Sequence, residues 1–348
     1  MDNKKPHGER ALFECAELIL PWLDPPELAS ISSTCKTLYH ISKTITARRT
    51  SDASRAFENF PIPFINAVDH QPYFYFIYTP SQILPSPSSS TSPQFQRQSW
   101  GSSNSMVKPK LNSSCVNTGR PSLESVSLGS EYGEEGYGCD CETCGEAGDG
   151  GFDCPCSRLN WGEIMSECGP SCRCGLECPN RLTQREVSVQ LKIVRDQRKG
   201  WGVHAAQLIR QGQFVCEYAG ELLTTKEARR RQHMYDELSS GGRFSSALLV
   251  VREHLPSGKA CLRINIDATR VGNVARFINH SCDGGNLLTM LMRSSGALLP
   301  RLCFFASRDI QEDEELSFSY GDTRLTLNGL HCFCGSPNCF GILPSECT

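Results

Sequence analysis

The residues best able to do chemistry in this chain are its cysteines, because of their number and their spacing. The 348 residues include 20 cysteines, and many of them are separated by only one to four residues. Such short spacings suit metal binding better than disulfides, and thiolates are preferred ligands of zinc. The N-terminus lacks the basic-then-apolar order of a secretory signal peptide. We therefore expect an intracellular, reduced protein that binds zinc.

The first cysteine group, called the front cluster below, lies in a stretch with few apolar residues. Its members are Cys139, Cys141, Cys144, Cys154, Cys156, Cys168, Cys172, Cys174 and Cys178. Three separate tetrahedral zinc ions need twelve ligands, which nine thiolates supply only if three of them each bridge two ions. The alternative is two ordinary four-cysteine sites with one spare thiol. In either case metal would supply the stability of this stretch.

The second cysteine group lies near the C-terminal end and contains Cys332, Cys334 and Cys339. A tetrahedral zinc site needs four ligands, so this group lacks one. We expect most of the other seven cysteines outside the front cluster to be plain buried or surface thiols. These are Cys15, Cys35, Cys115, Cys216, Cys261, Cys303 and Cys347, while Cys282 belongs to a separate motif.

Five short motifs follow one another between the two cysteine groups. They are Lys199-Gly200-Trp201-Gly202, Glu217-Tyr218-Ala219-Gly220-Glu221, Ile266-Asp267-Ala268, RFINHSC at 276–282, and Glu315-Leu316-Ser317-Phe318-Ser319-Tyr320-Gly321. Each is weak alone, because a Gly-x-Gly usually marks a turn and a lone Tyr or His is more often structural. Together and in this order, over about 139–341, they resemble the SET-domain protein-lysine methyltransferases with pre-SET and post-SET modules. Among these the plant Su(var)-related group is the most similar.

The resemblance implies transfer of a methyl group from S-adenosylmethionine to a lysine amine of a histone tail. It implies that Tyr320 and Phe318 are catalytic. Cofactor contacts are implied for Lys199, Gly200, Trp201, Asn279, His280 and Tyr320. It also implies three zinc ions in the front cluster and a fourth ion for which Cys282 joins the C-terminal group. Arg276 and Asp267 are expected to support the site from behind.

The chemistry implied is an in-line displacement, which needs a neutral amine, a dry path and close alignment of the reacting atoms. An apolar aromatic channel favours the neutral amine by lowering the lysine pKa. Two positions depart from the family pattern: Ala247 stands where a tyrosine is frequent, and Ser319 where an aspartate is usual. We expect Ala247 to weaken one wall of the site. Phe318, rather than a tyrosine, suggests capacity for di- or trimethylation.

The elements that must position these residues are mostly strands. Alternating patterns predict strands within 187–194, 214–223 and 302–310. One helix is predicted, opened by a capping box of Thr224 and Glu227 and running to about Leu238. We expect a mostly β protein with minor α: small curved sheets around a knot-like active site. The histone tail would bind as an added strand against a sheet edge.

The domain organisation follows from composition and from the motifs. We predict a helical N-terminal segment (1–60), a lead-in strand (61–78), a disordered Ser/Pro/Gly-rich linker (79–135), a pre-SET cluster (136–182), a SET domain (183–323) and a post-SET module (328–348). Residues 11–58 resemble an F-box, which would bind a Skp-type adaptor. The simpler alternative is a small helical hairpin that packs on the rest of the protein.

Charge and hydropathy limit the partners. The net charge of −3 gives no sign of wholesale electrostatic binding to nucleic acid and fits a basic partner. No apolar run reaches the roughly 18 residues of a membrane span. By analogy with its family, the enzyme is expected in the nucleus on chromatin, modifying lysine nine of histone three in heterochromatin and gene silencing. The rival hypothesis is a chromatin-binding module with a decayed site.

Overall fold

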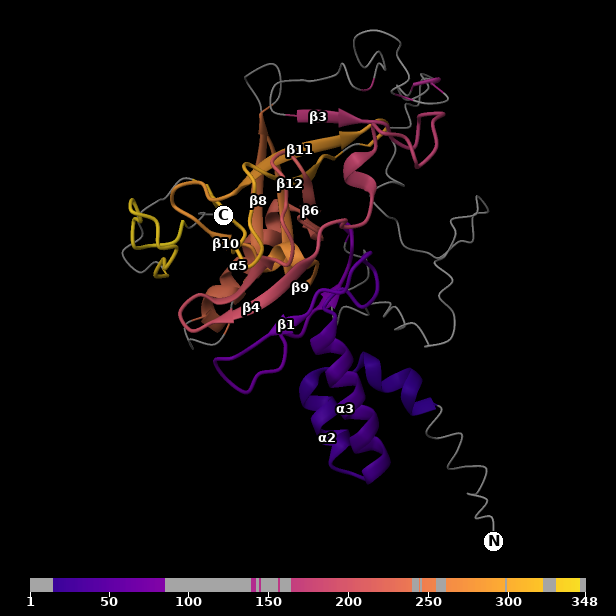
Figure 1. Cartoon of the computed structure of the whole chain (residues 1–348), viewed down its shortest axis with the longest axis vertical. Helices are drawn as coiled ribbons and strands as arrows, with labels where there is room; N and C mark the ends of the chain where they lie inside the picture. Colours follow the sequence, from indigo (N-terminus) through magenta and orange to yellow (C-terminus); the bar gives the residue numbers. More distant parts are fainter. Residues whose placement is uncertain are drawn as a thin grey trace.

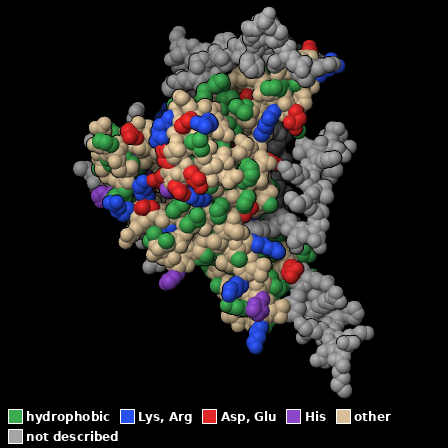
Figure 2. All heavy atoms as spheres, viewed as in Figure 1, with side chains coloured by type: hydrophobic (Ala, Val, Ile, Leu, Met, Phe, Trp, Pro, Cys, Tyr) green, Lys and Arg blue, Asp and Glu red, His purple; other side chains and the backbone are tan. Residues whose placement is uncertain are grey.

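A computed structural model describes residues 15–84, 139–141, 144, 156, 164–239, 244, 246–254, 261–297, 299–321 and 330–344. Cys154, Cys115, Cys347 and residues 85–135 of the predicted linker lie outside the described residues. Within these ranges no helix has the length and apolar content needed to cross a membrane. On the face seen in Figure 2, basic and acidic side chains are interspersed, and no large patch of one sign is visible.

The N-terminal segment forms a helical hairpin at one end of the molecule (Figure 1). It consists of η1 (Leu20–Trp22), α2 (Pro25–Ser32) and α3 (Lys36–Ser51). A capping box opens α2, because Asp24 accepts from the Glu27 backbone N–H at 2.8 Å and Glu27 accepts from the Asp24 N–H at 2.9 Å. The hairpin has a small core of its own, made by Ala16, Leu20, Leu28 and Ile45.

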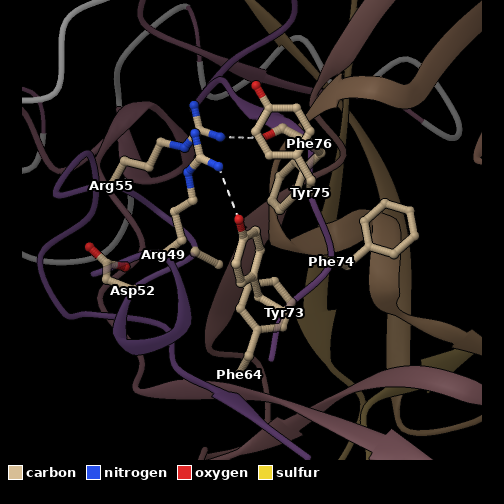
Figure 3. Close-up of a pocket in the computed structure, with 9 residues that line it drawn as sticks. Arg49, Asp52, Arg55, Phe64, Tyr73, Phe74, Tyr75 and Phe76 are labelled. Atoms are coloured by element: carbon tan, nitrogen blue, oxygen red, sulfur yellow. Dashed lines mark hydrogen bonds between the residues drawn. The ribbon is translucent and has the colours of Figure 1, made fainter. Parts of the chain in front are cut away.

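Arg49 links this hairpin to the segment that follows it (Figure 3). Arg49 of α3 is only 3% exposed and donates to the Tyr73 hydroxyl at 2.9 Å. It also donates to the backbone oxygens of Pro21 and Leu23, at 3.0 and 2.7 Å, and lies 4.8 Å from the ring centre of Tyr75. These contacts surround a buried cation with dipoles and ring faces, although its Nε has no partner among the described residues. The hairpin therefore packs directly against the segment that follows it.

The lead-in segment differs from the single strand predicted over 61–78. It forms two short strands, β1 (Phe64–Ile65) and β2 (Ile77–Tyr78), which pair in parallel with β4 (Leu191–Asp196) and β9 (Cys261–Gly272) respectively. A turn separates them, in which the Asn66 side chain accepts from the N–H groups of Val68 and Asp69. Such local side-chain bonds compete with the hydrogen bonds of a continuous strand. The segment therefore supplies the edge strand of two different sheets instead of one longer strand.

The rest of the described chain is mostly strand, which confirms the predicted fold class. The remaining strands are β3 (Ile164–Glu167), β5 (Gly200–Ala205), β6 (Phe214–Glu217), β7 (Gly220–Leu223), β8 (Leu248–His254), β10 (Asn279–His280), β11 (Leu287–Ser294), β12 (Arg301–Ala306) and β13 (Ser317–Phe318). They form small sheets in the orders β1-β4-β5, β3-β11-β12-β6, β2-β9-β7 with β8 on β9, and β10-β13. Two 3-10 turns, η3 (Leu182–Gln184) and η4 (Val274–Phe277), connect them.

The predicted helix is present as α5 (Thr225–Ser239), one residue from the expected bounds at each end. Its capping box is half formed among the described contacts. The Thr224 hydroxyl accepts from the Glu227 N–H at 3.3 Å, but the Glu227 carboxylate pairs with Arg230 and Arg231 of the next turn. Arg231 also reaches Glu221 at 2.6 Å and the fully buried Asp267 at 2.7 Å. This buried ion network fixes α5 against β7 and β9.

One short strand pairing joins the RFINHSC motif to the motif at 315–321. Strands β10 and β13 pair in parallel, with Asn279 opposite Ser317 and His280 opposite Phe318. The neighbouring Gly285 has φ +73°, and a Cβ there would lie 2.3 Å from the Ser317 oxygen. Only glycine permits this backbone approach. Residues almost forty positions apart are thus brought together at the centre of the molecule.

Candidate active site and metal centres

The Gly-x-Gly loop, the RFINHSC motif and the motif at 315–321 meet around the carboxylate of Glu315. Glu315 accepts from Lys199 Nζ at 2.5 Å and from Asn279 Nδ2 at 2.8 Å. A Cβ at Gly202 would lie 2.9 Å from both Glu315 and Asn279, so glycine allows the close approach. Asn279 Nδ2 also lies 3.4 Å from the Trp201 carbonyl oxygen. The motif pattern predicted no role for Glu315, although its place in the last motif was the available signal.

A continuous set of aromatic contacts lies beside this network. Ring centres are 4.9 Å apart for Phe318 and Tyr320, 4.8 Å for Phe304 and Phe318, and 6.3 Å for Tyr218 and Phe304. The strand β13 ends at Phe318, so Tyr320 follows it rather than lying within it as expected. The two rings are nevertheless in contact, as their spacing suggested.

The tyrosine hydroxyls of this group are both engaged by backbone oxygens. Tyr320 donates to the Ile278 oxygen at 2.7 Å, and Tyr218 donates to the Ala247 oxygen at 3.0 Å. Burial raises the pKa of both phenols well above the usual value. They therefore stay protonated and act as fixed dipoles. Ala247, the departure noted above, contributes only its backbone to this contact.

Trp201 and His280 complete the residues expected around the cofactor. Trp201 is 7% exposed, packs at 5.2 Å on Phe64, and has an indole N–H with no partner within the described part of the chain. His280 accepts from the Tyr320 backbone N–H through Nδ1 at 3.1 Å, and its Nε2 lies 3.2 Å from the Cys282 sulfur. Burial lowers the pKa of His280, opposed by the Phe318 backbone.

Four cysteines near the C-terminal end form a set called the rear site below. The sulfurs of Cys282, Cys332, Cys334 and Cys339 all lie within 4.8 Å of one another. Cys282 comes from the RFINHSC motif, and its sulfur is 3.8 Å from that of Cys332 and 4.0 Å from that of Cys339. Four thiolates at this separation fit a tetrahedral zinc ion. The structure thus brings the implied fourth ligand to the other three.

The front cluster contains two overlapping groups of four sulfurs. One is Cys139, Cys144, Cys168 and Cys174, and the other is Cys139, Cys156, Cys168 and Cys172. Because Cys139 and Cys168 belong to both, these two groups of described cysteines could each hold an ion only if those thiolates were shared. Cys178 is buried in the same cluster and Cys141 packs against it.

Polar groups around the front cluster donate hydrogen bonds to its sulfurs, although burial raises the pKa of Cys156 and Cys168. Asn180 donates to the sulfur of Cys168 at 3.2 Å, and Ser295 donates to that of Cys156 at 3.0 Å. Although burial opposes it, the backbone N–H groups of Cys139 and Gly169 lower the pKa of Cys172 to about 7. Donors of this kind stabilise metal-bound sulfur. The chemistry of the donor set therefore fits zinc.

An ion network attaches the front cluster to the catalytic sheets. Arg301 of β12 pairs with Glu167 of β3 at 3.0 Å and with Glu217 of β6 at 3.2 Å. It also donates to the backbone and side-chain oxygens of Thr183 at 2.9 and 2.8 Å. All three charged side chains are at most 14% exposed. The contact is therefore a buried, hydrogen-bonded interface.

Comparison with known proteins decides the family. The SET domain model matches residues 200–321. Over 351 aligned residues the chain is 57% identical to histone-lysine N-methyltransferase SUVR3 of Arabidopsis thaliana, covering 99% of this chain and 94% of that protein. This chain belongs to the SET-domain histone-lysine methyltransferases. The expected family and enzyme class are thereby confirmed.

Solved SET-domain structures agree. Arabidopsis thaliana SUVH6 in complex with SAM is 26% identical with a TM-score of 0.59, covering 84% of this chain and 55% of that chain. KRYPTONITE in complex with mCHH DNA, H3(1-15) peptide and SAH is 25% identical with a TM-score of 0.57, covering 84% and 53%. The SET fold is confirmed, and this SET-domain methyltransferase is an S-adenosylmethionine-dependent enzyme.

The site fits that cofactor. S-adenosylmethionine carries an ammonium, a carboxylate, hydroxyls and a purine, which need complementary charges and hydrogen bonds. Lys199, Glu315 and Asn279 supply a cation, an anion and an amide donor in one place. The glycine at 202 leaves room for close backbone approach. The residues expected at the cofactor thus form one connected set, with the aromatic group beside it.

Proposed function

We propose that this enzyme methylates lysine nine of histone three and so contributes to heterochromatin and gene silencing. The observation that carries the proposal is the H3(1-15) peptide bound by KRYPTONITE, whose fold this chain shares. Lysine nine lies within that peptide. A histone substrate is also consistent with the histone-lysine methyltransferase activity of the 57% identical relative. The enzyme would accordingly act in the nucleus, on chromatin.

In the proposed mechanism the chain's own residues orient the amine and keep water away. S-adenosylmethionine supplies, when bound, a methyl group on a positively charged sulfur. The buried aromatic group of Tyr218, Phe318 and Tyr320 favours the neutral lysine, whose proton leaves to solvent before transfer. The Tyr320 hydroxyl donates a hydrogen bond to the Ile278 carbonyl oxygen, which leaves the lone pairs of the hydroxyl oxygen free to accept from the amine. Alignment within this dry site supplies the rate.

The other roles follow the same geometry. Lys199, Trp201 and Asn279, with the backbone of Gly200 and His280, would hold the cofactor, and Glu315 would position Lys199 and Asn279. The front cluster would hold three zinc ions and the rear site one. Cys154 would be the ninth front ligand, beyond the described residues.

The test is a methyl-transfer assay on histone-tail peptides with product analysis by mass spectrometry. We expect methylation of an H3(1-15) peptide, and loss of product when lysine nine of that peptide is replaced by alanine. Replacing lysine four or lysine fourteen serves as the matched control and should leave product formation unchanged. Methylation that persists without lysine nine would contradict the assigned target while leaving the enzyme class intact.

A second candidate function concerns the N-terminal hairpin. Leu18, Ile19 and Tyr39 are 63, 57 and 49% exposed, although the segment has a core of its own. Exposed apolar side chains of this kind favour a protein partner, here a Skp-type adaptor. Co-purification of the chain with such an adaptor tests it, and Leu18→Glu with Ile19→Glu should abolish capture. Equal capture by this variant would contradict an interface at the hairpin.

A further inference from the structure

His280 lies between the rear site and the backbone of Tyr320. Its Nδ1 is 3.1 Å from the Tyr320 backbone nitrogen, and its Nε2 is 3.2 Å from the sulfur of Cys282. The imidazole also packs on the Tyr320 ring, with centres 5.2 Å apart. The histidine itself is 6% exposed. Both ring nitrogens are therefore used inside the protein.

The direction of these two hydrogen bonds follows from the backbone. The Tyr320 N–H can only donate, so Nδ1 must present a lone pair. In a neutral imidazole the proton then sits on Nε2, which faces Cys282. A thiolate that holds a metal ion is a charged acceptor, so the N–H···S contact is a charge-assisted hydrogen bond. The ring thus connects a rear-site ligand to the peptide group of the catalytic tyrosine.

Tyr320 depends on this connection because it follows β13 instead of belonging to it. The ladder between β10 and β13 ends at His280 and Phe318. Beyond it, the hydroxyl is held by the Ile278 oxygen and the backbone N–H by His280. A shift of the imidazole would therefore move one of the two polar anchors of the tyrosine.

We propose that His280 is a positioning residue that couples metal occupancy of the rear site to the placement of Tyr320. A metal at Cys282 fixes the thiolate, the thiolate orients the imidazole, and the imidazole holds the Tyr320 peptide. The side chain of His280 is then not a cofactor ligand, and only its backbone remains for that role. The coupling rests on the methyltransferase activity of this chain but not on which histone lysine is modified.

Two substitutions separate the two hydrogen bonds. His280→Asn can keep an acceptor near Tyr320 but loses the donor to sulfur, whereas His280→Gln can keep the donor to Cys282. His280→Phe keeps the ring contact and removes both bonds. His204→Asn is the matched control, since His204 is a histidine on β5 whose ring bonds the Asp313 backbone oxygen at 2.8 Å, away from the rear site.

The first readout is the metal itself. In cadmium-loaded protein, the rear-site 113Cd resonance should move in His280→Asn and His280→Phe, and less in His280→Gln. The rear metal should be lost to a chelator about 10- to 100-fold faster in the first two. Unchanged front-cluster resonances show that the variants are folded. An unchanged rear resonance with unchanged metal release in the folded Asn and Phe variants would overturn the proposal.

The second readout is Tyr320. Opening the rear site by Cys339→Ser should shift the 15N amide resonance of Tyr320 in an otherwise wild-type chain but not in one that carries His280→Phe. In methyl transfer to an H3(1-15) peptide, His280→Phe should lower kcat about 10- to 100-fold with KM for S-adenosylmethionine within about threefold. A raised KM with unchanged kcat would instead place the ring at the cofactor. The resonance readouts need no histone, so they stand even if the proposed target lysine is wrong.

Discussion

The front cluster and the rear site share thiolate chemistry but are connected to the catalytic domain in different ways. The front cluster meets it through the ion pairs of Arg301 with Glu167 and Glu217, which lie among the sheets. The rear site takes Cys282 from the same motif as Asn279 and His280, and His280 contacts Tyr320. The same metal chemistry would thus stabilise the fold in one place and, on our proposal, order the active site in the other.

The largest effect on turnover should come from Tyr320, the residue that His280 connects to the rear site. Tyr320→Phe removes one hydroxyl and its bond to Ile278, so turnover should fall about 100- to 1000-fold. The cost in free energy of unfolding should be about 1 kcal/mol, and zinc content should not change. Steady-state kinetics, denaturant unfolding and metal analysis check this. Wild-type turnover would identify Tyr320 as a core residue without a role in transfer.

Opening the rear site itself should have the next largest effect. Metal analysis should find about four zinc ions in the wild type and about three in Cys282→Ser. Turnover should drop about 10- to 100-fold, because the tail and the imidazole lose their anchor. Cys261→Ser, at an exposed thiol outside both metal centres, is the control. Full activity with full zinc in Cys282→Ser would mean that the fourth ligand is another residue.

Breaking the front connection should change stability more than catalysis. Arg301→Met leaves Glu167 and Glu217 buried without their cation, which should cost about 3 kcal/mol in free energy of unfolding. The kcat of the folded variant should stay within about threefold of wild type. Arg210→Met, which removes an exposed pair with Asp309, should cost less than about 1 kcal/mol. If Arg301→Met lost as much kcat as Cys282→Ser, the front cluster and the rear site would not differ in their effect on catalysis.

A smaller change concerns the number of methyl groups added. Phe318 is 3% exposed and its ring contacts both Phe304 and Tyr320. We expect di- and trimethylated product from wild type under exhaustive turnover, and mostly monomethyl product from Phe318→Tyr, because an added hydroxyl binds water and restricts the amine. Mass spectrometry of the peptide product measures this. Identical product mixtures would point to Ala247 as the next position to change.

The smallest effect is expected at the surface of α5. The bond from Arg230 lowers the pKa of Glu227 to about 2, with burial opposing and Arg231 adding to the effect. A lowered carboxyl pKa stabilises above the unfolded value near 4.5, and this stability is lost as pH falls toward 2. Solvent screening limits it to about 0.5 kcal/mol. The free energy of unfolding of Glu227→Gln should differ from that of wild type by that much at pH 7, and the difference should vanish as pH falls through about 2. A difference that does not shrink would exclude this carboxylate as its source.

Local patterns were sufficient to predict the cysteines that the structure groups together, the motifs and α5. Cysteine spacing and motif order are short-range properties, so they can be read along the chain. Arg49 was not recognisable in this way, because a helix C-terminus commonly carries an exposed arginine, whereas here Tyr73 and Tyr75 bury it from 24 residues away and more. Glu315 and the orientation of the His280 ring depend likewise on partners that only the folded chain brings together. The lead-in segment divides into two strands because β4 and β9, far along the chain, each pair with one part of it.

The separation of the rear-site ligands along the chain also affects biosynthesis. Cys282 precedes Cys332 by 50 residues, and Cys339 comes seven residues later still. At about 5–20 residues per second, the ribosome adds those last ligands roughly 3–10 s after Cys282. Until then the nascent chain holds the rear metal with one thiol at most. With zinc at the rear site, activity would therefore be acquired late, after translation of the tail, and would depend on the zinc available to the newly made protein at that moment.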